Sequence, residues 1–409
     1  MKKLLSHITL LLTIISLSSF LSLFIIGCSK NNSNKAQYKS FLDYCEDKNL
    51  NDTTKKTITA LLKASDTNNC KDAMKVLEKN TLLNLAQRGD ISDLAPIAQF
   101  TNLETIDFSF NNITDITPLA KLKKLSGINL SHNKIKDISA LEDLVLLQGL
   151  NLGYNQIVDI SAIKKATKLK ALELSYNQIN DISDIKNLTE LSGLNVSTNQ
   201  ITSIDAINNL VNLEGIDFSR NKIKDLKPLK SLSKVTGIYA FQNEIEDLSP
   251  LKELKKLEIL NLAANKIVDI TPISALTKLN SLYLDDNKIT SIAPLKENQE
   301  LKGLAISNNL ISDISPLKSI TGILAIDLSK NKISDISSLK ELINLVAIRL
   351  QGNAITSAAV LTELNALKEI QIENNPLKKD NLSCPTNSKN EVLNSSCTKI
   401  LLNKDAEKK

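Results

Sequence analysis

The sequence predicts a repeat solenoid with a parallel β-sheet along one side, 3-10 or short helical turns along the opposite side, and a small α-helical N-terminal cap. First, one 22-residue pattern recurs thirteen times between residues 91 and 376 without insertion or deletion. Second, hydrophobic residues make up 42% of the chain and are mostly aliphatic, because aromatic residues make up only 3% and Trp is absent. Third, the spacing of the apolar residues changes from two to three within every repeat.

The two spacings indicate two kinds of local structure. Residues such as Ile128 and Leu130 alternate at period two, as a short strand with one buried face requires. The apolar residues that lie three apart suit tight helical or 3-10 turns. Each coil then leaves a thin apolar edge that only a neighbouring coil can cover. The repeats must therefore stack, with their strands side by side.

Every repeat carries an asparagine just after its strand. We expect these amides to point inward, where they donate to and accept from backbone groups that the turn leaves unpaired. The thirteen residues of this asparagine ladder are Asn111, Asn133, Asn155, Asn177, Asn199, Asn221, Asn243, Asn265, Asn287, Asn309, Asn331, Asn353 and Asn375. Two residues after each repeat start stands Asp or Ser, which predicts an acceptor for turn N–H groups rather than a calcium ligand.

The 22-residue period, the core L-x-x-L-x-L-x-x-N and the segment I-x-D-I-x-P-L resemble the leucine-rich repeats of the bacterial internalin family. The resemblance covers residues 91–376. It implies a curved solenoid whose concave strand face binds another macromolecule, usually a protein. It does not reach the C-terminal part, which shows no sorting motif, immunoglobulin-like segment or wall-binding repeat. Host-cell invasion is therefore not implied.

The first residues predict export and a lipid anchor. Two lysines precede a long apolar run, so residues 1–27 have the pattern of a bacterial secretion signal peptide. The segment around Gly27 resembles a lipoprotein cleavage box, so we expect lipidation of Cys28 and a flexible tether over residues 28–35. The alternative is an uncleaved membrane anchor. Both place the rest of the chain in the cell envelope, and a lipid anchor would hold it at the outer membrane or the cell surface.

The four remaining cysteines predict two disulfides in an exported chain. We expect Cys45–Cys70 and Cys384–Cys397, because each pair is close in sequence while nearly the whole chain separates the two pairs. The other two connectivities, and free buried thiols, are the alternatives.

The segments around the repeats are predicted to be caps. Residues 36–90 predict a helical, disulfide-stapled N-terminal cap, with Asp52 and Asn69 as helix N-caps, that ends in a degenerate first strand. Residues 377–401 predict a C-terminal cap with a disulfide, and residues 402–409 predict a disordered tail.

Outward-facing strand residues form columns along the concave face. One column holds six of the eleven glycines, and we expect a shallow trough there that a partner approaches closely. The alternative is that these glycines only reduce crowding on the concave side. The glycines proposed to contact a partner are Gly127, Gly149, Gly193, Gly215 and Gly237.

Aromatic residues in the seventh to ninth repeats give the main local binding hypothesis. They form a group, here named the concave patch, of Tyr239, Phe241, Ile259, Asn261 and Tyr283. Exposed aromatics ringed by polar groups are typical of an interface hot spot, and aromatics scattered on a surface without a dedicated partner are the alternative.

A second, weaker set of candidate contacts lies where the first strands end. Phe110, Tyr154 and Tyr176 occupy the same repeat position on the strand-exit rim. His132, the only histidine after His7, also occupies this position. Because the position varies between repeats, we expect His132 to be a solvated rim residue rather than a chemical site.

Catalysis and cofactor binding are not expected. Any triad or histidine-containing metal site would have to use His132. The concave carboxylates Glu173 and Asp217 are expected about 10 Å apart on an open face, with nothing to raise either pKa. No basic block with interleaved aromatics suggests nucleic acid. The sequence therefore predicts a protein-recognition scaffold, with binding of cell-wall or other polysaccharide as the alternative.

Overall fold

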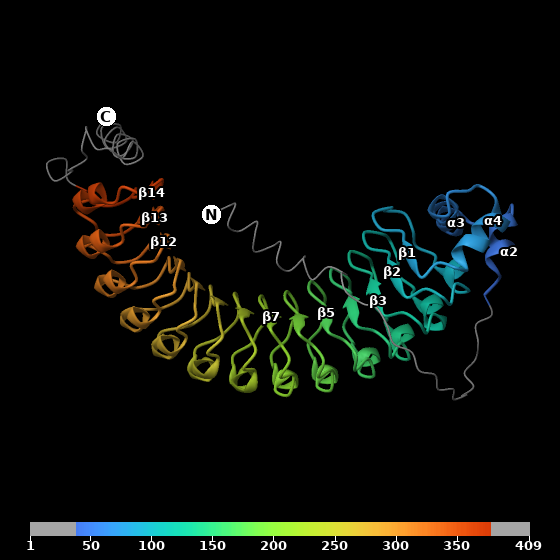
Figure 1. The fold of residues 1–409 in the computed structure, drawn as a ribbon, viewed down its shortest axis with the longest axis horizontal. Coiled ribbons are helices and arrows are strands. Elements are labelled where there is room, and N and C mark those ends of the chain that lie inside the picture. The colour runs from blue at the N-terminus through green and yellow to red at the C-terminus, as the bar shows by residue number, and fades with distance from the viewer. Residues whose placement is uncertain (1–37, 378–409) are drawn as a thin grey trace. The chain divides into compact units, whose positions relative to one another are not determined.

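The computed structural model describes residues 38–377, and the structural statements below concern this part of the chain. Fourteen strands form one sheet in sequence order, and every neighbouring pair is parallel. Figure 1 shows the coils from β1 to β14 following an arc, with the strands along its inner side. The strands are β1 (Leu82–Asn84), β2 (Thr105–Asp107), β3 (Gly127–Asn129), β4 (Gly149–Asn151), β5 (Ala171–Glu173), β6 (Gly193–Asn195), β7 (Gly215–Asp217), β8 (Gly237–Tyr239), β9 (Ile259–Asn261), β10 (Ser281–Tyr283), β11 (Gly303–Ala305), β12 (Ala325–Asp327), β13 (Ala347–Arg349) and β14 (Glu369–Gln371). The predicted fold class is confirmed.

The register of the sheet follows the repeat period. From β2 onward each strand residue pairs with the residue one period later, so that Gly127 lies beside Gly149 and Ile128 beside Leu150. Residues of one column therefore lie in a row across the sheet. The degenerate strand β1 pairs with β2 and begins the sheet.

Thirteen 3-10 turns lie on the outer side of the arc (Figure 1). In ten coils the leading Asp stabilises the turn, as where Asp115 Oδ1 accepts from the Thr117 N–H at 2.8 Å. Ser203 replaces this Asp and accepts from the Asp205 N–H at 3.1 Å. The turns are η1 (Ala95–Ile97), η2 (Thr117–Lys121), η3 (Ser139–Leu141), η4 (Ser161–Ile163), η5 (Ser183–Ile185), η6 (Asp205–Ile207), η7 (Lys227–Ser231), η8 (Ser249–Glu253), η9 (Thr271–Ala275), η10 (Ala293–Glu297), η11 (Ser315–Ser319), η12 (Ser337–Glu341) and η13 (Ala359–Glu363).

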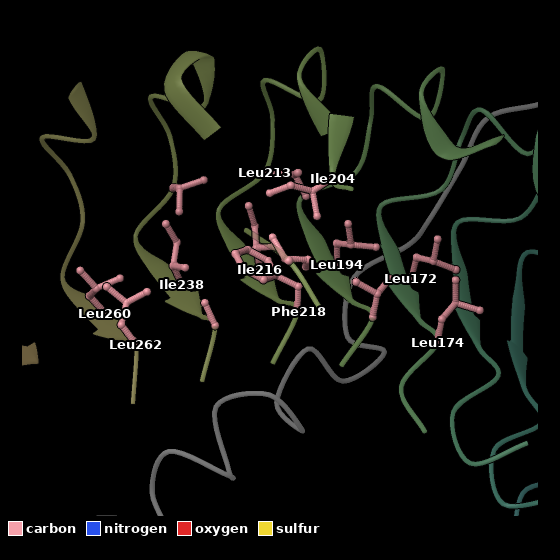
Figure 2. Close-up of a cluster of buried hydrophobic side chains, with 14 of the residues drawn as sticks. Leu172, Leu174, Leu194, Ile204, Leu213, Ile216, Phe218, Ile238, Leu260 and Leu262 are labelled. Carbon is pink, nitrogen blue, oxygen red and sulfur yellow. The ribbon is translucent and has the colours of Figure 1, made fainter. Parts of the chain in front are cut away.

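The core is one continuous stack of Leu and Ile side chains between the sheet and the turns. Figure 2 shows strand residues such as Leu172, Leu194 and Ile216 pointing into the interior, each beside its counterpart in the next coil. Most of these side chains have less than 5% of their surface exposed, so neither edge of an isolated coil would be stable in water.

Three helices cover the first coil: α2 (Phe41–Glu46), α3 (Asp52–Ala64) and α4 (Cys70–Leu77). The Phe41 ring lies 5.6 Å from the Phe100 ring of the array, measured between centroids. The hydroxyl of Thr57 donates to the Asp93 carbonyl at 2.7 Å. The predicted disulfide between Cys45 and Cys70 is present, and it ties α2 to α4.

Two details of this cap differ from the sequence expectation. The N-cap of α3 is Asn51, whose side chain accepts from the Thr54 N–H, while Asp52 is the first helical residue. Asp52 was therefore the wrong N-cap, whereas Asn69 caps α4 as expected. Helix α2 was not predicted, because its six residues are too few to show a period.

The predicted features of the chain ends lie outside the described residues. These are the signal peptide, the lipidated Cys28 with its tether over residues 28–35, the disulfide between Cys384 and Cys397, the C-terminal cap and the tail. Within residues 38–377, the structure contains no helix that combines the length and hydropathy of a membrane span.

Candidate binding surface

The asparagine ladder forms a continuous row of amides behind the strand ends, ten of them buried and three, Asn177, Asn199 and Asn353, half-buried. Asn133 Nδ2 donates to the carbonyls of Leu130 and of Phe108 in the preceding coil, both at 3.0 Å. Its Oδ1 accepts from the Ile113 N–H at 2.9 Å. The same bonds recur along the array, so each ladder amide joins two coils and its hydrogen-bonding groups are occupied.

The last residue of most strands has a local structural task. In nine strands its side-chain oxygen accepts from the N–H two residues later, as in Asp217 with Ser219 at 2.9 Å. Tyr239 and Tyr283 occupy this position in β8 and β10, where their phenol oxygens are too far from the backbone to make such a bond. These two residues therefore have no part in the turn that explains the Asp and Asn residues of the same column.

The register brings the concave patch together. Tyr239, Asn261 and Tyr283 are aligned across β8, β9 and β10, and Phe241 follows β8 by two residues. Ile259 begins β9, beside Gly237. All five side chains are half-buried.

Both tyrosines of the patch stay protonated at neutral pH. Burial raises the pKa of the Tyr239 phenol to about 12, and the nearby Tyr283 phenol and Asp217 carboxylate act in the same direction. Burial and the Asp285 carboxylate also raise the pKa of Tyr283. Each phenol can therefore donate a hydrogen bond to a partner as well as offer an apolar ring.

The glycine column is open where several of its members lie. A methyl group in place of the α-hydrogen of Gly149, Gly215 or Gly303 would have no other atom within 4 Å. At Gly237 it would meet only the Tyr239 ring, at 3.9 Å. Gly193 lies in the same row, in β6. Packing within the array therefore does not require glycine at the three open positions.

The concave carboxylates differ from the expectation in their electrostatics. Burial raises the pKa of both Glu173 and Asp217, so the prediction that nothing would raise either pKa was wrong. Hydrogen bonds oppose this effect at Glu173, whose Oε1 accepts from the Ser175 N–H and Oε2 from Asn195 Nδ2, both at 2.7 Å. Both carboxylates thus accept hydrogen bonds from neighbouring residues of the array. Among the described residues, no three His, Cys, Asp or Glu side chains are grouped so as to hold a metal ion.

The strand-exit rim is more ordered than the sequence suggested. The rings of Phe110, His132, Tyr154 and Tyr176 are stacked, with 4.0 Å between each neighbouring pair of centroids and interplanar angles of 11–14°. His132 is therefore half-buried between two rings rather than freely solvated, and burial lowers its pKa. We name these four residues the rim stack. The sequence feature that could have indicated this stack is an aromatic or histidine residue at the same repeat position in four consecutive coils.

Arg220 extends the rim stack and was not singled out from the sequence. Its Nη1 donates to the Tyr176 hydroxyl at 3.3 Å, reaching past the shorter Thr198 of the intervening coil. Its guanidinium carbon also lies 5.5 Å from the centroid of the Phe241 ring. Arg220 thereby links the rim stack to the concave patch.

Comparisons with known proteins agree with this architecture. A family model that describes two copies of the leucine-rich repeat matches residues 101–143, 123–165, 145–187, 167–209 and 255–297. No curated protein sequence matches the chain significantly.

Among solved structures, an internalin, InlF, from Listeria monocytogenes is similar at 31% identity and a TM-score of 0.76, over 78% of this chain and 95% of that one. The functional domain of InlJ from the same organism is similar at 22% identity and a TM-score of 0.71, over 84% and 72% of the two chains. A leucine-rich-repeat protein from Leptospira interrogans shares the fold at 21% identity and a TM-score of 0.69, over 76% and 88%. With this repeat geometry and the identity to InlF over nearly its whole length, the chain belongs to the internalin family of bacterial leucine-rich-repeat proteins.

Proposed function

We propose that this protein is an exported, lipid-anchored recognition scaffold that binds a protein partner on its concave face and catalyses no reaction. One observation carries the proposal. Tyr239 and Tyr283 stand where nine other strands place a side chain that stabilises the turn. The side chains of both tyrosines are half-buried and take no part in the hydrogen bonds of the strand-end turns. They are therefore suited to contact another molecule.

The chemistry of the patch fits a protein interface. Tyrosine combines a large rigid apolar surface with a hydroxyl, which makes it frequent among interface hot spots. Ile259 adds an aliphatic surface, and Asn261 adds an amide between the two rings. The open glycine column beside the patch would let a partner approach the sheet closely.

Polysaccharide binding is the second candidate. The same tyrosines would serve as stacking platforms, and the Asn and Asp side chains of the strand ends as hydrogen-bonding groups. Many of those polar side chains are already engaged in strand-end hydrogen bonds, which favours the protein partner.

The membrane attachment rests on the sequence around Cys28. A diacylglycerol and an acyl chain on this residue would give stable anchoring, which a single chain would not. The wild-type protein should incorporate a labelled fatty acid and lose residues 1–27, and changing Cys28 to Ser should abolish both. Wild-type protein that stays in the membrane fraction with residues 1–27 attached and without lipid label would instead indicate the uncleaved anchor.

The binding proposal is tested with full-length protein extracted in detergent and used as bait for envelope proteins. Purified cell wall and polysaccharide are offered in parallel. The captured partner should bind at least about tenfold more weakly to a Tyr239→Ala/Tyr283→Ala variant, as expected for interface anchors. Gln371→Ala, at the same strand position in β14, is the matched control and should bind normally.

Three outcomes would contradict the proposal. Unchanged protein binding by the double variant would exclude the concave patch as the site. Tyrosine-dependent retention on wall or polysaccharide, without any protein partner, would favour the alternative. An enzymatic activity that disappears in a His132→Ala variant would overturn the absence of catalysis.

A further inference from the structure

The rim stack is a partly exposed ridge, not a buried structural element. Phe110, Tyr154 and Tyr176 have 47%, 42% and 37% of their surface exposed. Each ring face inside the stack is covered by its neighbour at 4.0 Å, so mainly ring edges and tyrosine hydroxyls face the solvent. Ring edges carry the positive end of the aromatic quadrupole, which favours contact with carbonyl and carboxylate oxygens.

The residues of the stack adopt a backbone conformation that bulky side chains avoid. Their φ angles are +52° to +56°, in the left-handed region. Later coils place Asn308, Gly352 or Asn374 at the same position, where such residues adopt this conformation at little cost. Other coils place Thr198, Arg220, Gln242, Ala264 or Lys330 in the same conformation. The four rings are therefore distinguished by their stacking contacts and not by this backbone geometry.

The turns that carry the ridge are basic, whereas carboxylates flank them. Besides burial and Tyr176, Glu173 acts to raise the pKa of Tyr154, and Arg220 opposes the burial that raises the pKa of Asp217. The basic turns, residues 110–114, 132–136, 154–158, 176–180, 198–202 and 220–224, contain five Lys or Arg residues and no Asp or Glu. Within residues 38–377, Lys134, Lys136, Arg220 and Lys222 have no carboxylate within salt-bridge distance, and Lys224 has only Glu244 at 3.7 Å. The aspartates that follow these turns are occupied by backbone N–H groups, as Asp137 is by Ser139 at 2.8 Å.

We propose that the rim stack and Arg220 form a docking ridge for an acidic, aliphatic-rich segment of a protein. Backbone carbonyls and carboxylates of that segment would contact the ring edges, and its carboxylates would also pair with Arg220 and the rim lysines. Its aliphatic side chains would cover the remaining exposed ring surface. Because Arg220 contacts both Tyr176 and Phe241, the ridge continues into the concave patch and gives one surface that bends from the rim onto the sheet. This inference rests on the proposed function and specifies the class of partner.

The geometry argues against a sugar on the ridge. Carbohydrate rings bind aromatic residues through the faces of the aromatic rings, and the stack covers the inner faces itself. An acidic polysaccharide could still be attracted by the lysines, so it is included in the test.

The test uses full-length protein in detergent micelles and a phage library that displays random 12-residue peptides. Peptides selected on the wild-type protein should be enriched in Asp and Glu together with Leu, Ile and Val. Synthetic copies should bind at least about tenfold more weakly to Tyr154→Ala/Tyr176→Ala and to Arg220→Gln. Their binding should also weaken as NaCl rises, because the contact includes exposed charges. Gln242→Ala, at the rim position of the next coil, is the matched control and should bind normally.

Arg220→Gln keeps the test decisive if loss of two stacked rings destabilises the array, since Arg220 is exposed. Absence of enrichment, enrichment in basic peptides, or peptides that bind the rim variants normally would each overturn the proposal. So would binding of alginate, an acidic polysaccharide, that is lost in the rim variants while no peptide binds. Peptides whose binding depends only on Tyr239 and Tyr283 would refute the docking ridge but leave the proposed function in place. Peptide binding that depends on the ridge, without any partner on the concave patch, would support the docking ridge and refute the proposed concave site.

Discussion

At the scale of single residues, buried amides differ in how completely their groups are paired. Asn221 of the ladder donates to three carbonyls and accepts from the Ile201 N–H at 2.9 Å. Asn298 stands at a core position that other coils fill with Leu, Ile, Ala or Phe, and it is fully buried. Its Nδ2 donates to Ile273 and Leu276, but its Oδ1 has no partner among the described residues. One amide therefore stabilises the array, while the other carries a desolvation cost.

The same substitution should act in opposite directions at these two sites. Asn298→Leu should raise the free energy of unfolding by about 1 kcal/mol, because it removes a buried unpaired oxygen and adds apolar contact. The two carbonyls that lose the amide keep their backbone donors, the N–H groups of Leu276 and Leu279. Asn221→Leu should lower the same quantity by about 3 kcal/mol or more, since it leaves the Ile201 N–H buried without a partner. Urea unfolding followed by circular dichroism measures both changes, and a destabilised Asn298→Leu protein would contradict the argument.

His132 provides a direct measure of burial in the rim stack. Burial lowers its pKa, so its imidazole Cε1–H resonance should titrate with a midpoint below the usual value of about 6.5. Because the folded state binds this proton more weakly than the unfolded chain, the group's contribution to stability falls as pH drops below about 6.5. Tyr154→Ala exposes one face of the imidazole and should return the midpoint toward the usual value. A wild-type midpoint above 6.5 would mean that attraction between the imidazolium and the flanking rings outweighs burial.

At the scale of elements, the helical cap protects the first coil. Without α2 to α4, buried residues such as Leu85 and Phe100 would meet water at the start of the array. The disulfide closes a segment with a sequence separation of 25 residues and limits how far this cap can open.

Removing the disulfide should therefore loosen the cap. A Cys45→Ala/Cys70→Ala variant should lose about 3.5 kcal/mol of stability, which is the loop-closure entropy for a segment of this length. Thermal melting and hydrogen exchange of α3 amides would detect the change. If α3 exchanges as slowly in the variant as in the wild type, then packing such as that between Phe41 and Phe100 holds the cap without the disulfide.

The elements also show which features of the fold can be predicted from the sequence. Strands, turns and ladder follow from the 22-residue period, because each apolar position of a coil has one role and recurs thirteen times. The rim stack did not follow, since the period aligns the four ring positions but not the side-chain orientations that stack them. The raised pKa values of Glu173 and Asp217 depend on the burial of these side chains, which cannot be determined from the aligned repeat positions alone. The proposed binding residues remain a prediction from columns that the register now places side by side.

At the scale of the whole molecule, the array is modular, because each coil contacts mainly its two neighbours. Stability should then be close to a sum of coil and interface contributions, and removal of one complete period should preserve the register of all others. This property allows the spacing of the concave patch to be changed without altering either tyrosine.

Two deletions of equal length test the patch as a geometric unit. Removing residues 245–266 joins Glu244 to Ile267 in register and brings Tyr239 from two strands away from Tyr283 to the adjacent strand, about 4.8 Å away instead of about 10 Å. Removing residues 311–332 shortens the array equally but lies outside the patch. Both proteins should fold and melt cooperatively at slightly lower temperature than the wild type. Only the first should lose the partner captured by the concave face, because it changes the ring spacing and removes Ile259 and Asn261. Equal binding by both proteins would show that the partner does not recognise this arrangement, and equal loss would place its site over the array as a whole.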